Sequence, residues 1–196
     1  MGNRKKQIRP VPPLEELEAE LRRVRYHKRY GSVLRSTVYT LLIVAAAAVL
    51  LAMLVFPVLR IHGSSMTPSL VDGNLVICLK NSDYEAGDAI AFYYNNKILV
   101  KRVIARSGEW VDIDKDGYVY INGEKIDEPY VSERALGECD ITLPYQVPEG
   151  RVFVMGDHRS VSVDSRSTSV GCVSDEQIVG RLLVRVWPLS DIGTIG

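Results

Sequence analysis

Residues 41–59 read LLIVAAAAVLLAMLVFPVL, and this run decides how the rest of the 196-residue chain is organised. No polar side chain interrupts it, and no charged residue occurs between Arg35 and Arg60. A helix of about 20 such residues crosses the hydrocarbon core of a bilayer. A buried core helix and a cleavable signal peptide are the alternatives, but an h-region is shorter and lies nearer the N-terminus. We therefore expect an uncleaved transmembrane helix over residues 36–59.

The charges of the chain are distributed unevenly, although 24 Lys and Arg balance 24 Asp and Glu. Residues 1–35 hold ten basic residues and four Glu, so 14 basic and 20 acidic residues remain in the other 161. A basic leader can indicate a nucleic-acid arm, but beside an apolar run it has a simpler meaning. Flanks rich in Lys and Arg stay on the cytoplasmic side of a membrane. We expect a cytoplasmic segment over residues 1–35, an extracytoplasmic domain over residues 60–196, and no nucleic-acid partner.

The segments on either side of the apolar run have different periodicities. Before it, apolar residues recur at three- and four-residue steps from Leu14 to Val24, which predicts an amphipathic helix. After Arg60, short β-rich runs alternate with turn signals such as Asp72-Gly73, which predicts a mainly β domain, coiled or barrel-like. The predicted strands are residues 74–79, 89–94, 98–105, 118–122, 151–155 and 179–187.

One lysine lies inside a predicted strand, within the sequence ILVKRVI of residues 98–104. On an alternating strand Lys101 shares a face with Leu99 and Val103, whereas Arg102 points to the opposite face. A free lysine, with a pKa of about 10.4, is a poor base at neutral pH, but burial lowers that pKa. The strand pattern alone leaves two interpretations open, a catalytic base and an edge-strand lysine whose amine reaches water.

A serine hydroxyl becomes a nucleophile only beside a base, and lysine can replace histidine in that role. Of the three histidines, His27 lies on the expected cytoplasmic side, and neither His62 nor His158 accompanies a G-x-S-x-G turn. Ser64 and Ser65 are adjacent, and the residues alone do not choose between them.

Three segments together resemble the conserved boxes of the type I signal peptidases. Residues 63–70, GSSMTPSL, match the serine box Ser-Met-x-Pro-(Thr/Ser)-Leu, and residues 101–104, KRVI, are similar to the lysine box. Residues 156–166, GDHRSVSVDSR, resemble the third signature, usually Gly-Asp-Asn-x-x-x-Ser-x-Asp-Ser-Arg. The boxes follow an apolar span in the order of the family, and the resemblance extends from that span to the C-terminal end.

The resemblance implies a role for each matched residue. Ser65 would be the nucleophile, Lys101 the general base, and Ser162 the residue that orients the lysine amine. Met66 would line the substrate pocket, and Gly63 takes the position where some members carry a serine that donates to the oxyanion hole. The hole would then rest on backbone N–H groups such as that of Ser65. The structural ion pairs near the site would involve Arg102, Asp157, Asp164 and Arg166.

The sequence departs from the family pattern at other positions too. His158 replaces the common Asn, and residues 105–109 differ from the usual turn. Neither change touches a position that the resemblance makes catalytic. The cysteines, Cys78, Cys139 and Cys172, show no metal-like spacing, and both a Cys139–Cys172 bridge and three free thiols stay open.

The family implies a membrane-bound serine endopeptidase, in a single-span form like that of Gram-positive bacteria. It would remove signal peptides from secretory preproteins after an Ala-x-Ala-like motif, bound as an extended strand. Ser65 follows Arg60 by five residues, so even an extended chain places it within about 17 Å of the membrane edge. A protease held this close to the bilayer suits substrates that are themselves inserted in the membrane. The bilayer and the secretion translocon are the further expected partners, and no cofactor or metal is implied.

Two alternatives belong to other classes of protein. A cytosolic self-cleaving repressor also uses serine and lysine, but the apolar span argues against it. A non-catalytic relative that acts as an assembly chaperone for surface fibres would not need the serines and the lysine that are intact here as Ser65, Lys101 and Ser162.

Overall fold

The computed structural model describes residues 13–195, except for the side chains of residues 27–29. The chain divides into two compact units, residues 1–51 and residues 52–196, and each is described by itself. The basic stretch before Pro13, part of the expected cytoplasmic segment, lies outside the described residues.

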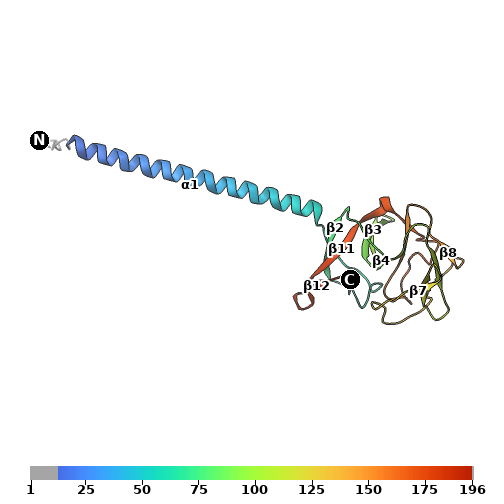
Figure 1. Ribbon diagram of the computed structural model, residues 1–196. Coiled ribbons are helices and arrows are strands. Elements are labelled where there is room, and N and C mark those ends of the chain that lie inside the picture. Colours follow the sequence, from blue (N-terminus) through green and yellow to red (C-terminus); the bar gives the residue numbers. More distant parts are fainter. Residues whose placement is uncertain (1–12, 196) are drawn as a thin grey trace, which may run out of the picture. The chain divides into compact units, whose positions relative to one another are not determined.

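A single helix, α1 (Leu14–Val55), contains both the expected amphipathic segment and most of the expected span (Figure 1). It ends at Val55 rather than at Leu59, because Pro57 disfavours helical conformation in the residue before it and has no N–H to donate. Residues 36–55 alone span about 30 Å at a helical rise of about 1.5 Å per residue. None of the most apolar stretch of α1 is buried, and the helix is long and apolar enough to cross a membrane.

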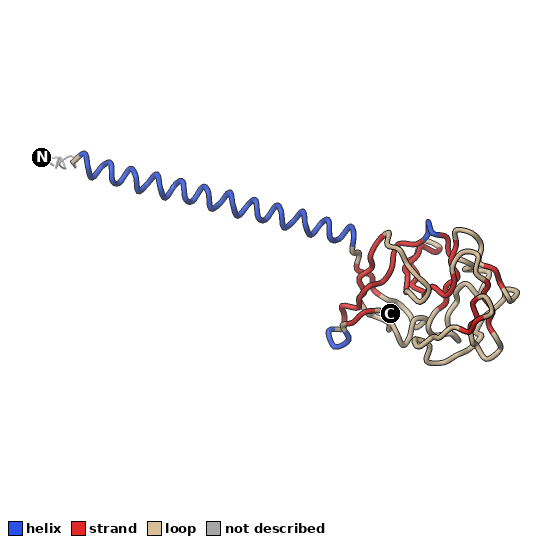
Figure 2. The backbone as a smooth tube through the Cα atoms, in the orientation of Figure 1, coloured by secondary structure: helices blue, strands red, loops and turns tan. Residues whose placement is uncertain are grey.

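The second unit is built from antiparallel strands in two sheets (Figure 2). The larger sheet has the order β1-β2-β11-β3-β4-β9-β10, with β12 paired to β11, and the smaller has the order β7-β6-β5-β8. The mainly β fold class is therefore confirmed. The strands of the larger sheet are β1 (Val58–Arg60), β2 (Leu75–Lys80), β3 (Ala89–Tyr94), β4 (Lys97–Ala105), β9 (Arg151–Met155), β10 (Val173–Ser174), β11 (Ile178–Trp187) and β12 (Gly193–Thr194). Those of the smaller sheet are β5 (Trp110–Ile113), β6 (Val119–Ile121), β7 (Glu124–Lys125) and β8 (Tyr145–Gln146), and the short 3-10 helices η1 (Asp175–Gln177) and η2 (Leu189–Asp191) flank β11.

All six predicted strands are present, with ends that differ by at most one residue. The strands that the sequence did not reveal have two to four residues, which is too short to display an alternating pattern. They form through pairing with longer neighbours: β1 joins β2, and β10 joins β9. The thiols of Cys78, Cys139 and Cys172 are all free.

Strand β4 carries Lys101 into the interior of the larger sheet. It lies between β3 and β9, so Lys101 pairs with Ile90 and Arg102 pairs with both Ala89 and Met155. Only 4% of Lys101 is exposed and Arg102 is fully buried. The interpretation of Lys101 as an edge-strand lysine is therefore wrong, because β4 is a central strand.

Candidate active site

The loop between β1 and β2, residues 61–74 and here called the serine loop, presents the adjacent Ser64 and Ser65. Its ends are tied together, since the Ile61 N–H donates to the Asn74 carbonyl at 2.9 Å. Met66 packs in the core beneath the loop. On this support Ser65 is half-buried whereas Ser64 is exposed. The structure thus distinguishes two neighbours that the residues alone could not separate.

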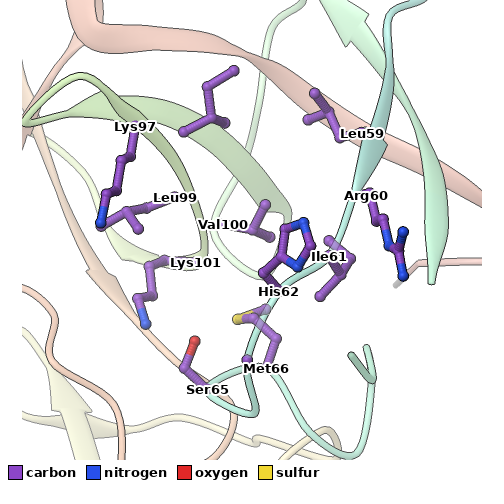
Figure 3. Close-up of a pocket in the computed structure, with 12 residues that line it drawn as sticks. Leu59, Arg60, Ile61, His62, Ser65, Met66, Lys97, Leu99, Val100 and Lys101 are labelled. Carbon is purple, nitrogen blue, oxygen red and sulfur yellow. The ribbon is translucent and has the colours of Figure 1, made fainter. Parts of the chain in front are cut away.

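Ser65 and Lys101 both line one cavity of about 570 Å³, which lies between the serine loop and β4. Figure 3 shows the Lys101 amine and the Ser65 hydroxyl pointing toward each other across this cavity. Met66 and Gly63 line it as well, and its wall is mostly apolar. The remaining lining residues are Leu59, Arg60, Ile61, His62, Lys97, Ile98, Leu99 and Val100.

The Lys101 amine is held by a short chain of hydrogen bonds. Its Nζ donates to Ser162 Oγ at 2.8 Å within the interior. The Ser162 carbonyl oxygen in turn accepts from Arg166 Nη2 at 3.3 Å. Ser162 is therefore held by Arg166 through its carbonyl and accepts a hydrogen from Lys101 through its hydroxyl, which fixes where the amine points.

Burial lowers the pKa of Lys101 from its ordinary value of 10.5 to about 8. The loss of hydration disfavours the ammonium form, while the carboxylates of Asp164 and Asp157 oppose the shift and Arg166 adds to it. A substantial fraction of the amine is thus neutral under mildly alkaline conditions. A neutral amine has a lone pair that can accept the proton of a serine hydroxyl.

The segment after β9 lies directly against the serine loop. A Cβ on Gly156 would fall 2.4 Å from the Ser65 carbonyl oxygen and 2.3 Å from Ser162 Oγ, so a side chain cannot be accommodated there without a shift. The His158 N–H donates to the same Ser65 carbonyl at 3.1 Å. Glycine at position 156 therefore allows the third box to bring Ser162 next to the serine loop.

The four residues assigned to ion pairs form two fully buried pairs. Arg102 donates to both carboxylate oxygens of Asp157, at 2.9 and 2.8 Å, and Arg166 donates to both oxygens of Asp164 at 2.8 Å. All four side chains are inaccessible to solvent. The first pair ties β4 to the third box, and the second holds the turn that contains Ser162.

A third buried pair was missed by the sequence analysis. Arg159 binds Glu128, with the shortest contact at 2.5 Å, and the Tyr130 ring lies 4.0 Å below the Arg102 guanidinium. Glu128 and Tyr130 both lie within residues 127–148, a stretch whose sequence has little periodicity and predicts an insertion or loop. A single sequence carries no signal that joins positions 31 residues apart.

The backbone around Gly63 restricts what can bind an oxyanion. Gly63 adopts φ +86°, and its N–H donates to the Asp72 carboxylate at 2.8 Å. The Gly63 N–H is therefore already bound. Within residues 13–195 no protein acceptor takes a hydrogen bond from the Ser65 N–H. Of these two groups, only the Ser65 N–H is available to a ligand.

Comparison with known proteins gives consistent matches. Residues 34–187 match the family model described as signal peptidase, peptidase S26. Signal peptidase IB of Staphylococcus aureus is 38% identical over 152 residues, which are 67% of this chain and 78% of that protein. Signal peptidase I of Bacillus amyloliquefaciens is 34% identical over 165 residues, which are 78% of this chain and 84% of that protein. A crystal structure of a signal peptidase I from Enterococcus faecalis V583 has 32% identity and a TM-score of 0.43, covering 52% of this chain and 97% of that one.

Proposed function

The chain belongs to the signal peptidase family, peptidase S26, and we propose that it hydrolyses its substrates with a dyad of Ser65 and Lys101. Family membership makes it a signal peptidase, and with the apolar helix α1 it indicates a membrane-anchored protein. The observation that carries the dyad is the buried Lys101 amine, held by Ser162 and directed at Ser65. In Figure 3 the Lys101 amine, rather than the ring of His62 in the same cavity, points at the Ser65 hydroxyl.

The chemistry follows from these contacts. Neutral Lys101 removes the proton of the Ser65 hydroxyl while Oγ forms a bond to the scissile carbonyl carbon. The tetrahedral intermediate collapses as the Lys101 ammonium returns this proton to the leaving amine nitrogen, which breaks the C–N bond. Water then attacks the acyl-enzyme with Lys101 again as the base, and Ser65 is released. Ser162 keeps the amine in position through both halves of the reaction.

The cavity also suits the expected substrate. An extended peptide can lie between the two walls, residues 59–66 and β4, and use backbone hydrogen bonds as an added strand. Small side chains such as those of an Ala-x-Ala motif let its backbone approach Ser65 closely. The mostly apolar wall, which includes Met66 and Leu99, favours uncharged residues before the scissile bond.

The membrane topology completes the proposal. The basic residues before the apolar run of residues 41–59 favour a cytoplasmic N-terminus, so the β unit would lie on the outer side of the cell membrane. Its substrates are then signal peptides of preproteins that have crossed the same membrane, with the secretion translocon as a neighbour. The alternative of a non-catalytic chaperone for surface fibres is disfavoured by the intact Ser65, Lys101 and Ser162.

The test is cleavage of a model preprotein by the full chain in detergent, followed by N-terminal sequencing of the product. Ser65→Ala and Lys101→Ala should each reduce kcat by at least about 1,000-fold, because the two groups act as one unit. Ser64→Ala is the matched control, and turnover within about threefold of the wild type is expected for this exposed neighbour. Turnover of Ser65→Ala within tenfold of the wild type would refute the dyad, and an inactive wild-type chain would refute the function.

A further inference from the structure

His158 contacts the serine loop at two points and Ser162 at a third. Its backbone N–H donates to the Ser65 carbonyl at 3.1 Å, and its carbonyl accepts from the Ser162 N–H at 3.1 Å. Its ring Nδ1 lies 3.0 Å from Thr67 Oγ1. The residue thus joins the loop of the proposed nucleophile to the residue that orients Lys101.

The direction of the side-chain contacts follows from counting hydrogens. Thr67 Oγ1 lies 2.8 Å from the Ser64 carbonyl oxygen, and two oxygens at this distance can share only the hydrogen of the hydroxyl. Thr67 therefore donates to Ser64 and accepts from His158, which requires the imidazole to carry its hydrogen on Nδ1. The result is a directed chain from His158 through Thr67 to the Ser64 carbonyl.

This chain fixes the plane of the peptide bond that joins Ser64 to Ser65. The Ser64 carbonyl also accepts from the Thr67 N–H at 3.1 Å, so it is held from two sides. In a trans peptide the carbonyl and the N–H point in opposite directions. The Ser65 N–H must then point away from Thr67. The cavity lies on that other side, because Ser65 lines it whereas Ser64 and Thr67 do not.

We propose that His158 is a positioning residue that acts through Thr67 to keep the Ser65 N–H directed into the cavity as an oxyanion donor. The inference rests on the proposed function and deepens it. It also explains how the site can work without a side-chain donor at position 63: with the Gly63 N–H bound to Asp72, the orientation of the Ser65 N–H carries the stabilisation of the oxyanion. His158 itself touches neither substrate nor the reacting atoms.

The experiment compares variants of the full chain in detergent on one preprotein, with kcat and KM measured separately. His158→Ala removes the first donor of the chain of hydrogen bonds and Thr67→Val removes its middle member, so the test does not depend on the folding of one variant. His158→Asn is the conservative variant, because its side-chain amide can donate where Nδ1 does. Ser160→Ala, at an exposed position in the same segment, is the matched control.

We expect kcat to fall by about 10- to 100-fold in His158→Ala and in Thr67→Val, with KM changed by less than about threefold. The loss lies in kcat because the oxyanion forms only in the transition state. The double variant should be no slower than the slower single variant, since both act on one chain of contacts. His158→Asn should recover most of the lost turnover, which a packing role for the imidazole would not allow.

A second readout addresses the oxyanion directly. A peptide aldehyde adds reversibly to the Ser65 hydroxyl, and the resulting oxygen occupies the place of the oxyanion, whereas the matching peptide alcohol binds without addition. His158→Ala and Thr67→Val should weaken the aldehyde at least about tenfold more than the alcohol.

Three outcomes would each overturn the positioning role. The variants could weaken the aldehyde and the alcohol equally, kcat could be unchanged in both variants at an unchanged Tm, or His158→Asn could fail to recover turnover. In those outcomes a wild-type chain that cleaves the preprotein still supports the proposed function. A wild-type chain that neither cleaves the preprotein nor binds the aldehyde overturns both.

Discussion

The decisive residue is Lys101, because its surroundings determine both its charge and its direction. Burial removes water from the ammonium form, and the Ser162 hydroxyl fixes the amine at 2.8 Å. The negative charge of Asp164 favours the charged form and so limits the shift, whereas Arg166, its ion-pair partner, adds to the shift. The pKa of about 8 is therefore a balance between desolvation, which lowers it, and the charge of the Asp164 carboxylate, which raises it.

The first residue-scale prediction concerns pH. Since Lys101 must be neutral to act as a base and its pKa is lowered to about 8, kcat/KM should fall tenfold per pH unit below about pH 8. Above that pH the amine is already neutral, and the profile should level off. The measurement is kcat/KM for a preprotein between pH 6 and 10, with Tm recorded at each pH as a control for unfolding. A profile that is flat from pH 6 to 9 would contradict a lysine base.

The residue scale also shows where sequence reasoning reached its limit. Alternation within residues 98–104 correctly placed Lys101 and Arg102 on opposite faces of a strand. It could not tell whether that strand lay at an edge or in the centre of the sheet, because the partners of β4 are β3 and the distant β9. The choice of Ser65 over Ser64 came from the family pattern, and the burial of Ser65 adds independent support.

At the scale of elements, strands with a repeating pattern were predictable and contacts between loops were not. Five of the six predicted strands have five or more consecutive residues in which a pattern can be seen, whereas β1 has only three residues and pairs with β2. The contacts that assemble the site join three segments: the serine loop, β4 and the third box. Gly156 and His158 make these contacts through backbone atoms and close approach, which leave little trace in a single sequence.

The element-scale prediction concerns the pair of Arg102 and Asp157, which connects β4 to the third box. Asp157→Asn leaves a fully buried guanidinium without its counter-charge, so the free energy of unfolding should fall by about 3–5 kcal/mol. The measurement is denaturant unfolding of the detergent-solubilised chain, followed through the β unit. The double variant Arg102→Met with Asp157→Leu should lose less than the sum of the single losses, because it buries no lone charge.

A matched control exists in the same sheet. Arg181 and Asp88 form a pair at 3.3 Å that is partly exposed, with 37% and 22% of the side chains accessible. Breaking it with Asp88→Asn should reduce the free energy of unfolding by no more than about 1 kcal/mol, because solvent screens the two charges. Equal losses for Asp157→Asn and Asp88→Asn would show that burial does not strengthen the first pair.

At the scale of the whole molecule, the candidate site and the apolar segment belong to different units. The cavity and the residues that support it all lie within residues 52–196, whereas most of α1 lies in the first unit. From the apolar run and the change in periodicity the sequence predicts boundaries after residues 35 and 59, whereas the two compact units meet between residues 51 and 52 and the helix ends at Val55. It follows that the chemistry and the attachment to the membrane can be separated experimentally.

The whole-molecule prediction uses a fragment that starts at Ala52. Because the β unit has its own core and contains the complete cavity, the fragment should fold and cleave a short soluble peptide with kcat/KM within about threefold of the full chain. On a preprotein inserted in vesicles the full chain should be faster by about 100-fold or more, because α1 holds enzyme and substrate in one membrane and raises their effective concentration. Full chain carrying Ser65→Ala sets the background rate. If the fragment processed the vesicle-bound preprotein as fast as the full chain, the membrane helix would have no part in reaching substrate, and the apolar surface of the cavity alone would have to account for it.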